Sequence, residues 1–84
     1  MCELLHNIEK VHTTDLGVVR ISKNLSLSNV DVVEWCKDKI LDKNALITRQ
    51  GKNWYVLIDN IKITVNAHSY TIITVHKIKI GNQL

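Results

Sequence analysis

Four histidines are the residues best suited to chemistry, because imidazole gives and takes protons near neutral pH. They are His6, His12, His68 and His76. His12 precedes a predicted helix, and Arg20 follows about two helical turns later. Cleavage of RNA through its ribose 2′-hydroxyl needs a base, an acid and fixed cations, but no metal ion. Histidine together with arginine or lysine has the right chemistry for that reaction.

We interpret His12 and His76 as a candidate acid–base pair, with Thr74 as a donor that orients the substrate. Arg20 and Lys52 would bind the phosphate. Each residue also has a structural explanation. His12 can bond to backbone at a helix corner, His76 can be a strand-end surface residue, and Arg20 can pair with a helix carboxylate.

Other kinds of site are not indicated by the sequence. It has no HExxH motif, no Cys/His cluster and no histidine pair at i, i+4, so we expect no metal site. GxSxG, GxGxxG and P-loop patterns are also missing, so we expect no bound cofactor and no serine-hydrolase chemistry.

Charge is distributed unevenly along the 84 residues, whose net charge is +3. Residues 1–42 hold five basic and seven acidic side chains, whereas residues 43–84 hold six basic side chains and one acid, Asp59. A basic half favours a polyanion or an acidic protein as partner. RNA and an intracellular protein are therefore both open as partners, although a solvated lysine face explains the charge equally well.

The same division marks a change of structural pattern. Residues 3–42 show helical spacing in segments near 3–10, 14–25 and 31–41, the last with Val33, Cys36 and Ile40 on one stripe. Gly17 lies in the first turn of the second segment, where close approach of another backbone would explain it. We therefore expect two to three helices in this layer.

Residues 45–78 alternate with a period of two and predict strands at 45–49, 53–58, 61–66 and 69–78. A two-residue turn at Asp59-Asn60 would pair Trp54 with Val65, Val56 with Ile63, and Ile58 with Ile61. If Ala67-His68 is also a two-residue turn, Tyr70, Ile72 and Thr74 face the core, and His76 continues that row to the sheet rim. Thr71, Ile73 and Val75 would then face outward.

The predicted fold is α+β: the helices pack on one face of a four-stranded antiparallel meander, forming a two-layer sandwich in a single domain, residues 1–84. Tyr55, Leu57 and Lys62 fall on the outer face of the sheet. There Tyr55 could stack on a base, and Leu57 and Lys62 could contact a partner. This face could also join two copies in a homodimer.

No apolar run approaches the length of a membrane span, so we expect no membrane association. Cys2 and Cys36 are far apart and show neither CxxC spacing nor a disulfide framework. They are interpreted as reduced thiols, and the protein as cytoplasmic.

Several segments together resemble a known family: residues 11–17 (VHTTDLG), Arg20-Ile21, residues 51–55 (GKNWY) and residues 69–77 (SYTIITVHK). They are similar to an uncharacterised bacterial family catalogued as domain of unknown function 3781, over about residues 10–78. That resemblance implies no activity. The layout is more distantly similar to the barnase–colicin–RelE class of ribonucleases and toxins, which implies metal-free RNA cleavage with His12, Arg20, Thr74 and His76 as site residues and Lys52 in support.

Two functions follow from these observations. The first is a small, metal-free, toxin-like endoribonuclease that uses the His/Arg/Lys set. The alternative is a non-enzymatic binding module, such as a small regulator or a phage-type inhibitor, which docks through its basic sheet layer or its apolar outer face.

Overall fold

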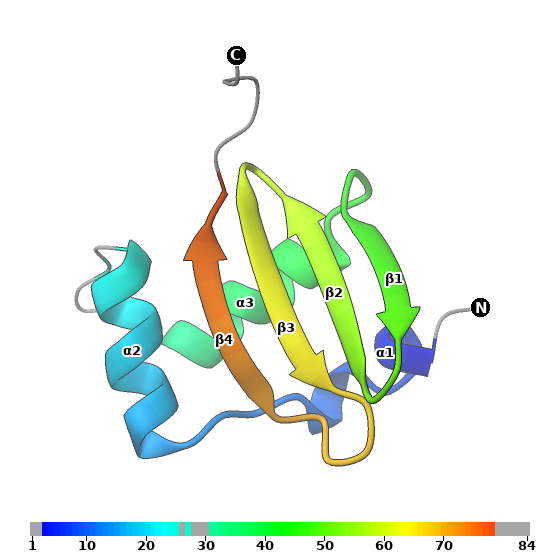
Figure 1. Cartoon of the computed structure of the whole chain (residues 1–84), viewed down its shortest axis with the longest axis horizontal. Coiled ribbons are helices and arrows are strands. Elements are labelled where there is room, and N and C mark those ends of the chain that lie inside the picture. The colour runs from blue at the N-terminus through cyan, green and yellow to red at the C-terminus, as the bar shows by residue number, and fades with distance from the viewer. Residues whose placement is uncertain (1–2, 26, 28–30, 79–84) are drawn as a thin grey trace.

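In a computed structural model, helices precede strands along the chain (Figure 1). The structure describes residues 3–25, 27 and 31–78. The elements in this part are α1 (Glu3–His6), the 3-10 helix η1 (Ile8–Lys10), α2 (Asp15–Leu25), α3 (Val32–Leu41), β1 (Leu46–Gln50), β2 (Asn53–Ile58), β3 (Ile61–Asn66) and β4 (Ile72–Lys77). The α+β class is confirmed. Among these helices, none combines the length and the apolar character needed to cross a membrane.

The sheet is a meander in which β1, β2, β3 and β4 follow one another, each antiparallel to its neighbour. Figure 1 shows α1 and α3 behind the sheet and α2 alongside β4. No element of the described chain covers the opposite face of the sheet, which we call the open face. By strand alternation it includes Leu46, Thr48, Gln50, Asn53, Tyr55, Leu57, Lys62, Thr64, Ile73, Thr74 and His76.

Polar side chains begin both longer helices. The Gly17 N–H donates to Thr14 Oγ1 at 3.0 Å at the start of α2, and the Glu34 N–H donates to Asp31 Oδ1 at 3.2 Å at the start of α3. Such caps satisfy amides that have no partner inside the helix. The buried stripe of α3 consists of Val32, Cys36 and Ile40. Val33, predicted on that stripe, is only half-buried, and Val32 takes its place.

Gly17 is required by a side chain rather than by the backbone contact that we expected. A Cβ atom at Gly17 would lie 2.1 Å from Thr13 Oγ1. That hydroxyl donates to the Ile72 carbonyl of β4 at 2.9 Å. The absence of a side chain at Gly17 therefore lets Thr13 connect the start of α2 to the sheet.

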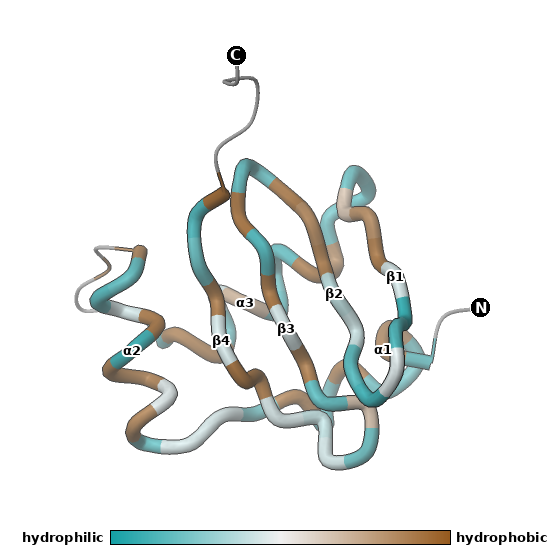
Figure 2. Tube along the Cα trace, in the orientation of Figure 1, coloured by the Kyte–Doolittle hydropathy of each residue, from teal (hydrophilic) through white to brown (hydrophobic). Residues whose placement is uncertain are grey.

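The hairpin of β2 and β3 has the predicted register. Asp59 and Asn60 have φ angles of 50° and 63°, as a two-residue turn of type I′ requires. The predicted pairs Trp54/Val65, Val56/Ile63 and Ile58/Ile61 all form, and all six side chains are buried. Figure 2 shows the resulting alternation of hydrophobic and hydrophilic residues along the strands.

The predicted register of β4 is wrong beyond Ile72. Residues 67–71 separate β3 from β4 in place of a two-residue turn, and a bulge lies where Thr64 and Val65 pair with β4. Tyr70 and Ile72 face the core as expected, with the Tyr70 ring 5.3 Å from that of Trp54. The bulge then reverses the alternation. Val75 is fully buried opposite Ile63, and Thr74 and His76 turn to the open face.

The two edges of the sheet differ. At the β4 edge, His12 forms a parallel bridge with Thr71. The His12 backbone N–H donates to the Tyr70 carbonyl at 3.1 Å, and the His12 carbonyl accepts from the Ile72 N–H at 2.7 Å. Farther along, Asn24 Nδ2 donates to the Val75 carbonyl at 3.1 Å. The opposite edge is β1, whose strand partner is β2 alone.

Candidate functional site

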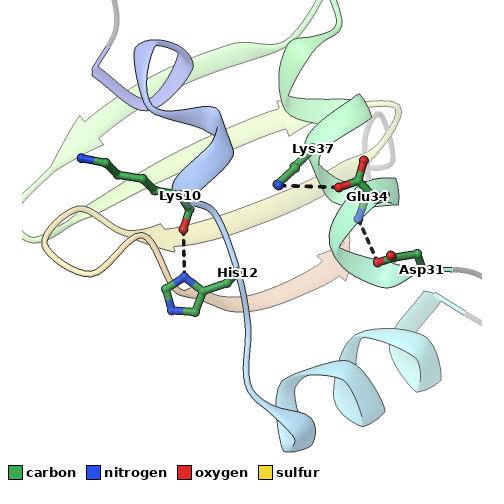
Figure 3. Close-up of polar contacts among 5 residues, drawn as sticks. All are labelled: Lys10, His12, Asp31, Glu34 and Lys37. Atoms are coloured by element: carbon green, nitrogen blue, oxygen red, sulfur yellow. Dashed lines mark hydrogen bonds and ion pairs between the residues drawn. The ribbon is translucent and has the colours of Figure 1, made fainter.

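A chain of hydrogen bonds holds His12 beside the β3–β4 loop, which lies at the lower end of the sheet in Figure 1. His12 Nδ1 lies 2.8 Å from the Lys10 carbonyl (Figure 3), and its Nε2 lies 3.2 Å from Thr71 Oγ1. Because a carbonyl only accepts, Nδ1 carries a proton in this arrangement. Thr71 Oγ1 is in turn 2.7 Å from Ser69 Oγ. An imidazole next to two hydroxyls is a pattern used to activate nucleophiles.

The surrounding backbone does not complete such a site. The N–H groups of residues 67–70 all donate inside the protein, to the Lys52 carbonyl, to Asn66 Oδ1 twice, and to the Asn66 carbonyl. None of these four amides is therefore free to stabilise a developing oxyanion. The hydrogen bonds of His12 are better explained by a structural role, because they fasten the amino-terminal segment to the β3–β4 loop.

His76 and Thr74 lie elsewhere, on the open face. His76 is opposite Lys62 on β3, and Thr74 is opposite Thr64. His76 is five residues beyond Thr71, the residue that His12 contacts, or about 16 Å along an extended strand. The expectation that the two imidazoles converge is therefore wrong, because β4 separates them and the bulge turns His76 away from the core-facing row.

The predicted phosphate ligands are also apart. Arg20 is exposed on α2, beside β4. Lys52 is exposed in the turn between β1 and β2. This turn lies at the edge of the sheet opposite to α2 (Figure 1). The structure thus distributes the five residues His12, Arg20, Lys52, Thr74 and His76 over several surfaces.

Lys52 instead joins a different group of residues at the lower end of the sheet. A hollow of about 630 Å³ lies between the β1–β2 turn and the β3–β4 loop, and its lining residues are Arg49, Lys52, Asn66, Ala67, His68 and Ser69. We call it the end hollow. Two of its residues are permanently basic, and none is a carboxylate.

The open face carries the predicted contact residues Tyr55, Leu57 and Lys62 together. They line a shallow hollow of about 300 Å³ with Thr48 and Gln50. Lys62 Nζ lies 4.9 Å from the centre of the Tyr55 ring, within cation–π range. Leu57 is paired with Leu46 of β1, and these side chains are 36% and 58% exposed. Apolar and basic groups therefore adjoin on this face.

Cys36 is fully buried on α3, and burial raises the pKa of its thiol to about 12. A thiol that stays protonated at neutral pH is a poor nucleophile and a poor metal ligand. Cys2 lies outside the described residues. Residues 3–25, 27 and 31–78 also contain no cluster of three or more His, Cys, Asp or Glu side chains suited to a metal ion.

Comparison with known proteins identifies the family. A family described as "Protein of unknown function (DUF3781)" matches residues 5–76. The chain belongs to DUF3781. No curated protein and no solved structure matches the chain. The predicted membership is confirmed, whereas these comparisons lend no support to the resemblance to ribonucleases.

Sequence reasoning missed part of what this DUF3781 chain assembles. Arg49 and His68 in the end hollow were not selected, because the strand and the loop that carry them meet only through tertiary structure. The signal that existed was the concentration of basic residues after residue 42. Within this DUF3781 fold, Arg49 and Lys52 line the end hollow and Lys62 lies on the open face, whereas Lys43 and Lys77 lie outside both.

Proposed function

We propose that this protein is a non-enzymatic binding module whose open face docks on a protein surface that combines acidic and apolar groups. One observation carries the proposal: the open face places the exposed Leu57 opposite Lys62 and, among the described residues, carries no carboxylate. The ribonuclease hypothesis is not carried forward, because its acid and base are separated along β4.

The apolar contribution comes from both ends of the sheet. Leu46 and Leu57 form a cross-strand pair, and the bulge leaves Ile73 43% exposed. Burying such side chains against a partner contributes about 25 cal/mol for each Å² of apolar surface removed from water.

The charge of this face determines which partner fits. Lys62 lies opposite His76 and above the Tyr55 ring. The one acid of the described sheet layer, Asp59, is at the β2–β3 turn and pairs with Lys39 of α3. A carboxylate on the partner would therefore find Lys62 without an acidic competitor on the open face.

The same charge argues against a homodimer through this face. A twofold contact places the same patch on both copies. Lys62 of each copy would then be buried in a contact to which neither open face, among the described residues, contributes a carboxylate. An acidic protein partner supplies that carboxylate.

The area of the sheet indicates a modest complex. Four strands spaced about 4.8 Å apart, each about 20 Å long, present on the order of 400 Å². A standard stable interface buries about 800 Å² on each partner. Contacts confined to the open face would thus belong to the small, transient class of interfaces.

Affinity capture with immobilised protein, followed by calorimetry with the purified partner, tests the proposal. We expect Leu57→Asp and Lys62→Glu each to weaken the complex at least about tenfold, and Lys43→Glu, which makes the same charge change outside the open face, to leave it intact. Circular dichroism establishes that the variants are folded.

Equal binding by all these variants would overturn the proposal. A parallel titration uses labelled single-stranded RNA at several salt concentrations. RNA binding that Lys62→Glu abolishes, with a steep dependence on salt, would replace the protein partner by a nucleic acid.

A further inference from the structure

We infer that the end hollow is a binding site for the phosphate group of a small phosphate ester. This inference is independent of the proposed docking function, because the end hollow opens between two loops at the end of the sheet and not on the open face. It rests on the residues that converge there and on the contacts that hold them.

The arginine is positioned before any ligand arrives. Arg49 Nε donates to the Gly51 carbonyl at 3.1 Å, and the guanidinium lies 5.5 Å from the centre of the Trp54 ring. Gly51 has a φ angle of 58°, a left-handed conformation in which glycine is favoured. The turn thus fixes one edge of the guanidinium, while its terminal amino groups have the geometry to bind two oxygens of a phosphate.

The opposite wall is also preorganised. Asn66 Oδ1 accepts from the N–H groups of His68 and Ser69, each at 2.9 Å, and from Ser69 Oγ at 3.2 Å. The Ala67 N–H donates to the Lys52 carbonyl at 2.8 Å, which joins the two loops across the hollow. A ligand therefore meets loops already held in place, so little ordering is required on binding.

The charges favour a dianion. Lys52 and Arg49 both line the hollow, and the ion pairs of the described chain involve Lys37 and Lys39 instead. His68 also lines the hollow and offers an imidazole N–H to a further oxygen. A volume of about 630 Å³ exceeds the need of one phosphate and lies within the range of small-ligand sites. The remainder accommodates the organic part of the ester.

Nuclear magnetic resonance titration of the ¹⁵N-labelled full chain with ribose 5-phosphate tests this inference. We expect saturable shifts of the Lys52, His68 and Ser69 amide signals, weaker binding of inorganic phosphate, and no shifts with ribose. The double variant Arg49→Gln, Lys52→Gln is expected to lower affinity at least about tenfold.

The control is the double variant Lys43→Gln, Lys77→Gln, which removes the same charge at the opposite end of the sheet. It should bind like the natural protein. Equal losses in both double variants would overturn the inference, since they would show general charge attraction. Shifts caused by ribose alone, or no saturation up to about 10 mM ligand, would also overturn it. The variant Lys62→Glu, which tests the docking proposal, should bind ribose 5-phosphate normally.

Discussion

The covered and the open face of the sheet are built from alternate residues of the same strands, yet their surroundings are opposite. On the covered face Val56, Ile63 and Val75 are fully buried under the helices. On the open face Leu46 and Leu57 remain exposed to solvent. Because neighbouring residues point to opposite faces, one strand supplies both the core and the proposed docking surface. Stability and binding should therefore be separable residue by residue.

The largest expected effect is the difference in free energy of unfolding between a substitution on the covered face and one on the open face. Ile63→Ala should lower the free energy of unfolding by about 2–5 kcal/mol, because it removes buried methyl groups and leaves a cavity. Leu57→Ala, on the open face, should lower it by less than about 1 kcal/mol. Urea denaturation measures both.

A small domain can be wholly unfolded by the larger change. Ile63→Val, with an expected cost of about 0.5–1.5 kcal/mol, keeps the comparison measurable in that case. A cost for Leu57→Ala as large as that of Ile63→Ala would show that the open face is covered in solution.

The next effect concerns Cys36, which belongs to the helical cover. Burial raises the pKa of the folded thiol to about 12, whereas an unfolded cysteine titrates near 8.5. Above about pH 8.5 the unfolded state loses the proton that the folded state keeps, so the free energy of unfolding falls as pH rises. The contribution of Cys36 to this slope is at most about 1.4 kcal/mol per pH unit, and it ends at the folded pKa.

Urea denaturation at pH 8, 9 and 10 of the natural protein and of Cys36→Ala isolates this contribution. All other titratable groups are common to both proteins, so the difference between the two pH profiles reports on Cys36. Parallel pH profiles would contradict the assignment of a protonated, buried thiol at Cys36.

The smallest effect compares the two sheet edges. Thr13→Val should cost about 0.5–1.5 kcal/mol, because the hydroxyl that donates to the Ile72 carbonyl is lost. Thr48→Val, on the exposed strand β1, should change the free energy of unfolding by less than about 0.5 kcal/mol. The same denaturation measurement applies, and equal costs would mean that the Thr13 bond does not contribute to closing the β4 edge.

The β2–β3 hairpin could be predicted in detail because two independent signals agree. The Asp59-Asn60 turn fixes which residues oppose each other, and the alternation of Trp54, Val56 and Ile58 fixes which face is buried. The start of α2 was also accessible, since Thr14 is a residue type that caps helices.

The β4 register could not be predicted, because the bulge in the β3–β4 pairing leaves no signal in the sequence. One extra residue reverses which side chains face the core, and the residues on either side of it are of the same type. Ile72 and Ile73 are chemically identical, but one is buried and the other exposed. The candidate pair of His12 and His76 depended on that register. The end hollow was missed for a related reason: Arg49 and His68 approach through loop contacts that no local pattern encodes.

The bridge between His12 and Thr71 also bears on the order in which the molecule folds. The residues that it joins are 59 positions apart in the chain, whereas β2 and β3 meet across a two-residue turn. Closing a long loop has a higher entropic cost than closing a short one. During synthesis, the hairpin can form once Asn66 has emerged, but His12 waits for Thr71 and Ile72. A segment near the beginning of the chain is thus among the last to dock.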